Sequence, residues 1–341
     1  MEKELQEKID AARVKKFKSS FPFREHLGCS QIGESCERKL WYNFRWTKKP
    51  DHSARILRLF ETGELAEDRI SRDLKRAGIE VIQIDNRTGT QFRFSEIDGH
   101  FGGSMDCVIK YQGNWFVGEF KTHNEKSFKD LLKKELEESK PVHFAQVQIY
   151  MALAKIPRAM YIAVNKNTDE MYIETVDHDP NLSAALLDKA ERIIRSNIAL
   201  DKISNRKSWF ECKWCDYSET CHGEDIPDVN CRTCAFGIVQ DNWICVLNND
   251  KPCILSKEDQ KNGCKEHCFK PAILPKNFDF LESNQEVGNN FFKYKIGKKE
   301  VINGLPGIQS KELHINEEIL NDKNVKKVKE VFPESTISIE P

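Results

Sequence analysis

The sequence contains no long apolar segment. The longest apolar stretch of its 341 residues lies near Tyr150 and is broken by Lys155, Pro157 and Arg158. The first residues, Met1–Leu5, are charged and lack the apolar core of a signal peptide. Neither a membrane span nor export is therefore expected.

An excess of one charge is also missing. The chain has 53 Lys and Arg against 54 Asp and Glu, so its formal net charge is only −1, although charged residues make up 31% of it. This balance excludes a polycation of the histone or ribosomal type. Any contact with nucleic acid must therefore use local patches. The sequence also shows no internal repeat.

Cysteine, by contrast, is abundant. Twelve cysteines in a chain without a secretion signal indicate a reducing compartment, where clustered thiols bind metal more often than they form disulfides. We expect this compartment to be the cytoplasm of a bacterial cell or of an infected host cell.

Apolar spacing predicts alternating helices and strands over the first two thirds of the chain. Residues 53–77 repeat apolar side chains at helical spacing, and Gly78 ends that run. The turn Gln112-Gly113-Asn114 predicts a hairpin between two strands. Further elements are predicted as a charged helix or arm at 1–20, helices at 127–139, 141–154 and 182–197, and strands at 79–82, 104–111, 115–122, 159–164 and 171–174.

The periodic patterning gives way to cysteines and turn residues beyond Trp209. We predict a first domain over residues 1–225, a cysteine-rich module over 226–275 and a small C-terminal α+β extension of unknown role over 276–341. The extension contains candidate strands at 291–296 and 300–302 and then a Lys/Glu-rich stretch of helical character.

Three charged residues stand on strands that are otherwise apolar. Glu119 and Lys121 are two positions apart, so they point to the same face of one strand, and the hairpin brings Asp106 beside them. Carboxylates bind Mg²⁺, and an ammonium group can act on water or phosphate. Each residue alone would more simply form an ion pair or cap a turn. The three together favour a phosphodiester-cleaving site, because unpaired charges on apolar strands are costly.

The pattern Asp106, then Glu119-x-Lys121, resembles the PD-(D/E)xK nuclease superfamily in its RecB-like branch, with Met105 where the motif has proline. Gly63-x-x-x-Glu67 matches the upstream helix position of this superfamily, and Gln146-x-x-x-Tyr150 matches its downstream helix motif. The resemblance covers roughly residues 24–223. It implies an α/β fold with a restriction-endonuclease-like core, in which helices flank a mixed central sheet.

The resemblance also implies roles for these residues. Glu67, Asp106, Glu119 and the backbone carbonyl of Phe120 would coordinate one or two Mg²⁺ or Mn²⁺ ions. Lys121 would orient or help deprotonate the attacking water. Gln146 and Tyr150 share a helix face, so both can reach one phosphate or water.

Cys212-x-x-Cys215-x5-Cys221 is spaced as a metal half-site that requires one more ligand. Cys36 is the leading candidate and Cys29 is the alternative. The Cys36 segment resembles the N-terminal cysteine segment of iron–sulfur RecB-like nucleases, including the CRISPR-adaptation and AddB-type nucleases. That resemblance implies a structural [4Fe-4S] cluster, although zinc would satisfy the same four thiolates.

A second cysteine set follows between residues 231 and 268. Cys231-x-x-Cys234 resembles a zinc knuckle, so we expect one closed zinc site formed by this pair, Cys245, and either Cys264 or His267. Two further thiols, Cys253 and Cys268, would be spare. The alternative is a group of ordinary buried cysteines.

Basic and aromatic residues interleave between positions 38 and 49. Arg38, Lys39 and Arg45 are candidate contacts to a DNA backbone. Leu40, Trp41 and Phe44 at helical spacing are better explained as the core face of a helix.

These features predict a metal-dependent DNA exonuclease, similar to RecB-like nucleases encoded by phages, that acts in phage or bacterial recombination, repair or DNA processing. DNA is the expected partner, a recombination or single-strand-binding protein is a further candidate, and no membrane contact is expected. The main alternative is an iron–sulfur or zinc module that binds DNA or protein without cleaving. Electron transfer is disfavoured, because the cysteine spacing is unlike that of ferredoxins.

Overall fold

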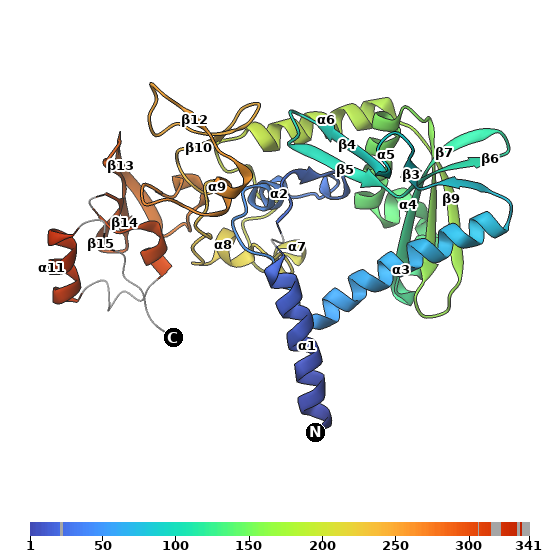
Figure 1. Cartoon of the computed structure of the whole chain (residues 1–341), viewed down its shortest axis with the longest axis horizontal. Coiled ribbons are helices and arrows are strands. Elements are labelled where there is room, and N and C mark those ends of the chain that lie inside the picture. Colours follow the sequence, from blue (N-terminus) through green and yellow to red (C-terminus); the bar gives the residue numbers. More distant parts are fainter. Residues whose placement is uncertain (21–22, 306, 315–321, 333–334, 336–341) are drawn as a thin grey trace. The chain divides into compact units, whose positions relative to one another are not determined.

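The structure is a computed structural model that describes residues 1–20, 23–305, 307–314, 322–332 and 335 (Figure 1). The chain forms two compact units, each built from two segments. The first unit contains Met1–Ser35 and Pro50–Arg192, and the second contains Cys36–Lys49 and Ile193–Pro341. The three-part division predicted from the sequence stays a prediction.

The first unit is built on a five-stranded mixed sheet in the order β2-β6-β7-β8-β9. Only β7 and β8 run parallel, and the other neighbours are antiparallel. This mixed α/β architecture, with helices around the sheet, confirms the predicted fold class. The strands are β2 (Glu80–Ile82), β6 (Cys107–Tyr111), β7 (Asn114–His123), β8 (Arg158–Asn165) and β9 (Met171–Asp177).

A second sheet of this unit has the order β1-β5-β4-β3. Its strands are β1 (Leu27–Gly28), β3 (Ile84–Asp85), β4 (Thr90–Glu96) and β5 (Phe101–Met105). The helices are α1 (Glu2–Ser19), η1 (Cys29–Gln31), α3 (Ala54–Arg76), α4 (Glu125–Ser139), α5 (Pro141–Ala154) and α6 (Pro180–Arg195), of which α6 runs on into the second unit.

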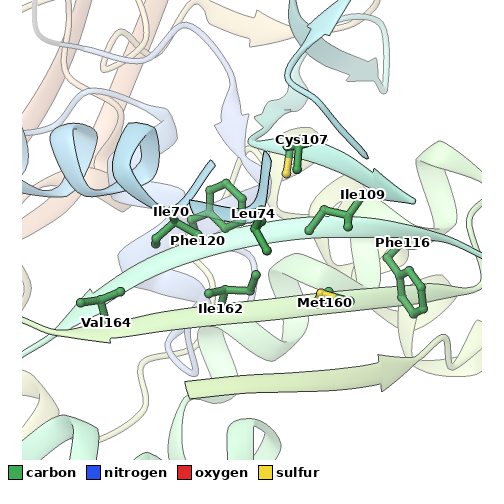
Figure 2. Close-up of a cluster of buried hydrophobic side chains, with 10 residues drawn as sticks. Ile70, Leu74, Cys107, Ile109, Phe116, Phe120, Met160, Ile162 and Val164 are labelled. Atoms are coloured by element: carbon green, nitrogen blue, oxygen red, sulfur yellow. The ribbon is translucent and has the colours of Figure 1, made fainter. Parts of the chain in front are cut away.

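Helix α3 begins and ends within one residue of the bounds predicted for it. The Ser53 side chain caps its N-terminus by accepting from the Ile56 N–H, and Gly78 follows its end with a φ of 78°. Ile70 and Leu74 of α3 pack into the cluster of buried side chains that contains Phe120, as Figure 2 shows. The middle of β7 therefore packs against α3. Near its other end, α3 contacts α1 through the ion pairs Arg13–Glu61 and Arg58–Asp10.

The predicted hairpin is confirmed. Tyr111 pairs with Asn114 across a two-residue turn in which Gln112 and Gly113 have φ values of 48° and 77°. Positive φ at both central positions is the geometry that matches the twist of a tight hairpin.

The predicted single strand over residues 104–111 is wrong. Met105 ends β5 in the four-stranded sheet, and Cys107 begins β6 in the five-stranded sheet. Asp106 lies between them and belongs to neither strand. The continuous apolar pattern conceals this break, because residues on both sides of it are buried.

Gly118 of β7 is packed closely against the neighbouring strand β6. A Cβ at this position would overlap the Cys107 sulfur and lie 3.0 Å from Ile109 Cδ1. Gly118→Ala is therefore expected to destabilise the protein by about 1–3 kcal/mol through overpacking, measured by denaturant unfolding. Gly63→Ala is the control, because Gly63 lies in α3 with no atom near its Cβ position, and its helix should be unchanged or more stable. Equal unfolding midpoints for wild type and Gly118→Ala would contradict this packing.

The second unit combines short helices with two small antiparallel sheets. Arg232 is buried at its centre, with its guanidinium 3.6 Å from the Trp46 ring centroid and 4.8 Å from that of Trp243. The elements are α2 (Glu37–Phe44), α7 (Phe210–Lys213), α8 (Ser218–His222), β10 (Gly237–Val239), β11 (Trp243–Cys245), β12 (Cys253–Ile254), α9 (Lys257–Lys261), η2 (Pro271–Ile273), β13 (Phe278–Glu286), β14 (Asn289–Ile296), β15 (Lys299–Gly304), η3 (Ser310–His314) and α11 (Lys323–Val331).

Strands β14 and β15 confirm the two predicted in the tail, whereas β13 was not predicted. Most of its side chains are exposed, so it lacks the alternation that marks a half-buried strand, and it is held by pairing with β14. Among the described helices, none is both long enough and apolar enough to cross a membrane.

Candidate active site and cysteine clusters

Strand β7 carries a row of polar side chains on one face. Glu119, Lys121 and His123 alternate with Phe120, whose ring points into the apolar cluster shown in Figure 2. The parallel neighbour β8 places Tyr161 beside Glu119 in the strand register. The predicted orientation of Glu119 and Lys121 is therefore what the structure shows.

Asp106 completes this row from the break between β5 and β6. The antiparallel pairing of β6 with β7 ends at the pair Cys107 and Gly118. The next amide of β7 on that side, that of Phe120, therefore has no partner in β6. Asp106 Oδ2 accepts that N–H, from Phe120, at 2.8 Å. The Phe120 carbonyl points to the same side as its N–H, and Lys121 Nζ lies 3.3 Å from it. Asp106 thus lies against the backbone next to Glu119.

Glu119 is fully buried, and its Oε1 accepts from the ammonium group of Lys121. In the described part of the chain, no donor reaches its other carboxylate oxygen, Oε2. Burial, reinforced by the charge of Asp106, raises the pKa of Glu119 to about 8. For Lys121, burial lowers the pKa, but the carboxylates of Glu119 and Asp106 more than offset this, so its pKa is raised.

Glu67 reaches the same place from α3. It lines a hollow of about 430 Å³ together with Lys121, His123 and His143. Burial and then the charge of Asp106 raise the pKa of Glu67 to about 7. Burial also raises the pKa of Asp106. The structure therefore brings Glu67, Asp106, Glu119 and Lys121 together.

The chemistry of this group fits a divalent cation. Three carboxylates surround one ammonium group, so the fully ionised site carries a net charge of −2 in a largely buried place, and all three carboxylate pKa values are raised. Glu119 Oε2 supplies a buried acceptor that lacks a donor. Within the described residues, no three His, Cys, Asp or Glu side chains, the cysteine sets included, are arranged as a ready ligand set. Lys121 and the Phe120 amide contact two of the carboxylates.

The downstream helix motif lies on α5. Gln146 and Tyr150 are both buried, and the Tyr150 hydroxyl donates to the Ser104 carbonyl at 2.7 Å. Its proton is therefore used to hold β5 beside Asp106. The predicted contact of Tyr150 with a phosphate or water stays a prediction, and its hydroxyl also has a side-chain hydrogen bond with Gln146.

A second hollow, of about 530 Å³, adjoins Lys121 on the side of Gln146 and Tyr150. Arg24 and Arg93 line it, and neither was singled out from the sequence. They come from the segment before β1 and from β4, which only the fold brings next to α5. Two guanidinium groups beside Lys121 make this hollow suited to a phosphate.

A chain of hydrogen bonds runs along the 430 Å³ hollow. Tyr161 Oη lies 2.8 Å from His123 Nε2 and 2.9 Å from His143 Nδ1, and Ser127 Oγ lies 3.2 Å from His123 Nδ1. Burial lowers the pKa of His123 to about 4 and that of His143 to about 3, so both imidazoles are neutral at pH 7. His143 and Tyr161 carried no motif in the sequence, because they meet only when α5 packs on the sheet.

The first cysteine set gathers in the second unit. Cys36 at the start of α2 interacts electrostatically with Cys212, Cys215 and Cys221, and the four line a small hollow of about 20 Å³. Cys29 belongs to the first unit and is fully buried there. The structure therefore favours Cys36 over Cys29 as the fourth member. Burial raises the pKa of the Cys215 thiol, and a backbone hydrogen bond from Tyr217, two residues further on, partly offsets this.

The second set lies around a hollow of about 570 Å³, which Cys231, Cys234, Cys245, Cys253 and Cys264 line together. Backbone hydrogen bonds from Phe236 to Cys234 and from Leu247 to Cys245 repeat the two-residue spacing of the first set. Burial raises the pKa of both thiols, and these backbone donors only partly offset it.

His267 is a poorer candidate ligand than Cys264. It is buried, its Nδ1 lies 2.8 Å from Ser310 Oγ, and its Nε2 lies 3.0 Å from the Asn230 carbonyl oxygen. Both nitrogens are engaged, so the structure favours Cys264 as the fourth ligand. Cys268 is also buried and accepts from Asn290 Nδ2 at 3.2 Å.

The predicted DNA contact through Arg45 is wrong. Its side chain is 0% exposed, and its guanidinium donates to the carbonyls of Ser196 and Arg232. Arg38 is half-buried and donates to the Leu200 carbonyl, whereas Lys39 is half-buried beside the first cysteine set. The aromatic residues of α2 are core residues, as predicted.

Comparison with known proteins finds one matching family and several similar solved structures. A family model described as the PD-(D/E)XK nuclease superfamily matches residues 23–222. No curated protein sequence gives a significant match. Among solved structures, the crystal structure of SSO0001 is 17% identical with a TM-score of 0.40, and the match covers 64% of this chain and 95% of that one.

Two similar structures are of LHK-Exo. The alkaline exonuclease (LHK-Exo) from Laribacter hongkongensis is 16% identical with a TM-score of 0.33, and its complex with dAMP is 14% identical with a TM-score of 0.34. Each match covers 55% of this chain and 90% of that one.

Proposed function

Because the chain belongs to the PD-(D/E)XK nuclease superfamily, we propose that it is a divalent-metal-dependent DNA exonuclease whose site is the group Glu67, Asp106, Glu119 and Lys121. The observation that supports this most is the net negative charge of three carboxylates, of which Glu119 is buried and Glu67 and Asp106 are half-buried, beside one lysine. Such a group is costly in a folded protein unless a cation compensates it.

Glu67, Asp106, Glu119 and the Phe120 carbonyl would hold one or two Mg²⁺ or Mn²⁺ ions, since hard oxygen ligands suit these ions. A bound ion would lower the pKa of its water and neutralise charge that develops on the scissile phosphate. Lys121 Nζ, released from Glu119, would then donate a hydrogen bond that orients that water and helps its deprotonation by stabilising the hydroxide.

The remaining residues would position the DNA strand and the catalytic carboxylates. Arg24 and Arg93 would hold a phosphate neighbouring the scissile one, in the hollow next to Lys121. Gln146 faces the same hollow and can donate its amide to a phosphate oxygen. Tyr150 holds β5, and with it Asp106, through the Ser104 carbonyl.

End-dependent cleavage is the test of this function. Purified protein with Mg²⁺ or Mn²⁺ is given linear DNA labelled at either end and a covalently closed circle of the same sequence. Progressive loss of the linear DNA with the circle intact is the expected result, and the labels report the direction. Cleavage of the closed circle would show an endonuclease, and no cleavage of either would favour a binding module.

Metal binding in this site is expected to depend on pH. The raised pKa values of Glu67, about 7, and Glu119, about 8, mean that protons compete with the ion below those values. In the ion-free protein, Glu67 and Glu119 keep their protons at pH values at which the same side chains of the unfolded chain are ionised. Their contribution to the stability of the folded protein is therefore lost as pH rises through about 8. Mg²⁺ should therefore raise the melting temperature more above pH 8 than below pH 7, in differential scanning fluorimetry.

Glu119→Gln provides the control for this pH effect. The amide keeps the shape of the carboxylate but has neither its charge nor its titration. The Mg²⁺-induced shift should shrink in this variant and lose most of its dependence on pH. A shift that is the same at both pH values in the wild type would contradict the assigned ligands.

We further propose that the two cysteine sets hold separate structural metals. Cys36, Cys212, Cys215 and Cys221 would hold a [4Fe-4S] cluster, following the resemblance to iron–sulfur RecB-like nucleases. A cluster of that size requires the four thiols to open beyond the present hollow of about 20 Å³, whereas a single zinc ion does not. Cys231, Cys234, Cys245 and Cys264 would hold zinc.

The proposed setting is phage or bacterial DNA recombination, repair or processing in a reducing cytoplasm. None of the twelve cysteines forms a disulfide in the structure. A recombination or single-strand-binding protein is the proposed partner.

A further inference from the structure

The short helix α7 of the second unit carries an unusual group of exposed aromatic side chains. Trp209, Phe210 and Trp214 are 43%, 75% and 74% exposed, although they lie within six consecutive positions. Large aromatic side chains are normally buried, since each removes a large apolar area from water. An exposed patch of this kind marks a surface that binds a ligand or partner.

These side chains cluster around the single turn of α7, which Trp209 precedes and Trp214 follows. Lys213 N donates to the Trp209 carbonyl at 2.9 Å, so residues 209 and 213 are one turn apart. Cys212 is buried on the other side, at 6% exposed, within the first cysteine set. We call Trp209, Phe210, Lys213 and Trp214 the aromatic face. The cysteines hold its inner side, and solvent reaches its outer side.

Basic residues accompany the aromatic face, together with the acidic Glu211 and Asp216. Lys213 Nζ lies 5.4 Å from the Trp214 ring centroid, in a cation–π contact. Arg206 precedes the face, and its carbonyl accepts from the Trp209 N–H at 3.0 Å. Lys207 is paired with Glu219 at 2.5 Å, so Arg206 and Lys213 are the cations suited to phosphates.

We propose that the aromatic face binds single-stranded DNA, with unpaired bases stacked on Trp209, Phe210 and Trp214 and phosphates held by Arg206 and Lys213. Stacking on exposed rings needs bases that are free on at least one side, which a single strand offers and a closed duplex does not. The inference rests on the proposed function for its substrate class, and it assigns a second DNA contact in the unit that lacks the carboxylate group.

The test uses the full chain with Asp106→Ala, so that DNA is not consumed. A labelled single strand of about 20 thymidines and a blunt duplex of equal length are titrated, and anisotropy and tryptophan fluorescence are recorded. Trp214→Ala should weaken single-strand binding about tenfold, whereas Trp214→Phe should keep most of it, since stacking depends on the ring. Duplex affinity should change less.

Trp115→Ala is the matched control. Trp115 is 40% exposed and has Lys110 Nζ 5.0 Å from its ring centroid, but it lies on the hairpin of the first unit. Its loss should leave binding unchanged. Phe210→Ser tests the same face without altering a residue next to Cys215, and circular dichroism with metal analysis confirms that each variant is folded.

Single-strand affinity that is equal in the parent, Trp214→Ala and Phe210→Ser would overturn the proposal, as would an equal loss in Trp115→Ala. Because binding is read in a protein that cannot cleave, the outcome is separate from the proposed function. Wild-type protein that fails to degrade linear DNA would reject the exonuclease while leaving the binding result intact.

Discussion

Wild-type protein is expected to degrade linear DNA with Mg²⁺, and Lys121→Ala to do so at least about a hundredfold more slowly. The reason lies in the pair that Lys121 forms with Glu119. Burial already raises the pKa of Glu119 to about 8 with Lys121 present, and Lys121 is one of the groups that lower it. Without the ammonium group, Glu119 stays protonated to higher pH and becomes a poor metal ligand. The same substitution removes the group that acts on the attacking water.

Initial rates on end-labelled linear DNA measure this effect. Lys129→Ala is the control, because Lys129 is an exposed lysine on the neighbouring helix α4 and is paired with Glu125. It should cleave at the wild-type rate. Thermal unfolding should show that Lys121→Ala remains folded, since protonation of Glu119 relieves the buried charge. A Lys121→Ala protein with wild-type activity would remove Lys121 from the mechanism.

Cys215→Ser is expected to abolish iron binding and with it much of the soluble yield of the protein. Cys215 lies beside Cys36, and the two segments of the second unit that carry them are far apart in the sequence. A metal bound by both closes a long loop, so its loss should loosen that unit. Iron and zinc are measured by elemental analysis, and the cluster by its visible absorbance, after anaerobic purification.

The two cysteine sets serve as controls for each other. Cys264→Ser should lose zinc and keep iron, whereas Cys215→Ser should lose iron and keep zinc in the fraction that stays soluble. Cys29→Ala should keep both metals, because Cys29 lies in the first unit. Colourless wild-type protein with two zinc ions and no iron would show that the first set binds zinc.

Local rules were enough for the elements that carry the site. Pro141 at the first position and an apolar run to Ala154 predicted α5 with the bounds that the structure has. Alternation along β7 placed Glu119 and Lys121 on one face, and a two-residue turn placed the Asp106 segment beside them. Each of these inferences depends on residues that are close in the sequence.

Features that depend on distant partners were missed. The break at Asp106 arises because β5 and β6 join different sheets, which burial on both sides hides. Arg45 has the sequence context of a DNA contact, but its guanidinium is buried and donates to the carbonyls of Ser196 and Arg232. Arg93 and His143 reach Lys121 only through packing of β4 and α5.

The most direct test of the catalytic assignment is the anomalous scattering of Mn²⁺ in crystals grown above pH 8. The account predicts one or two manganese peaks within bonding distance of the Glu67, Asp106 and Glu119 carboxylates and the Phe120 carbonyl. Manganese that binds elsewhere, or crystals in which these carboxylates keep their contacts to Lys121 and the Phe120 amide at saturating Mn²⁺, would contradict it.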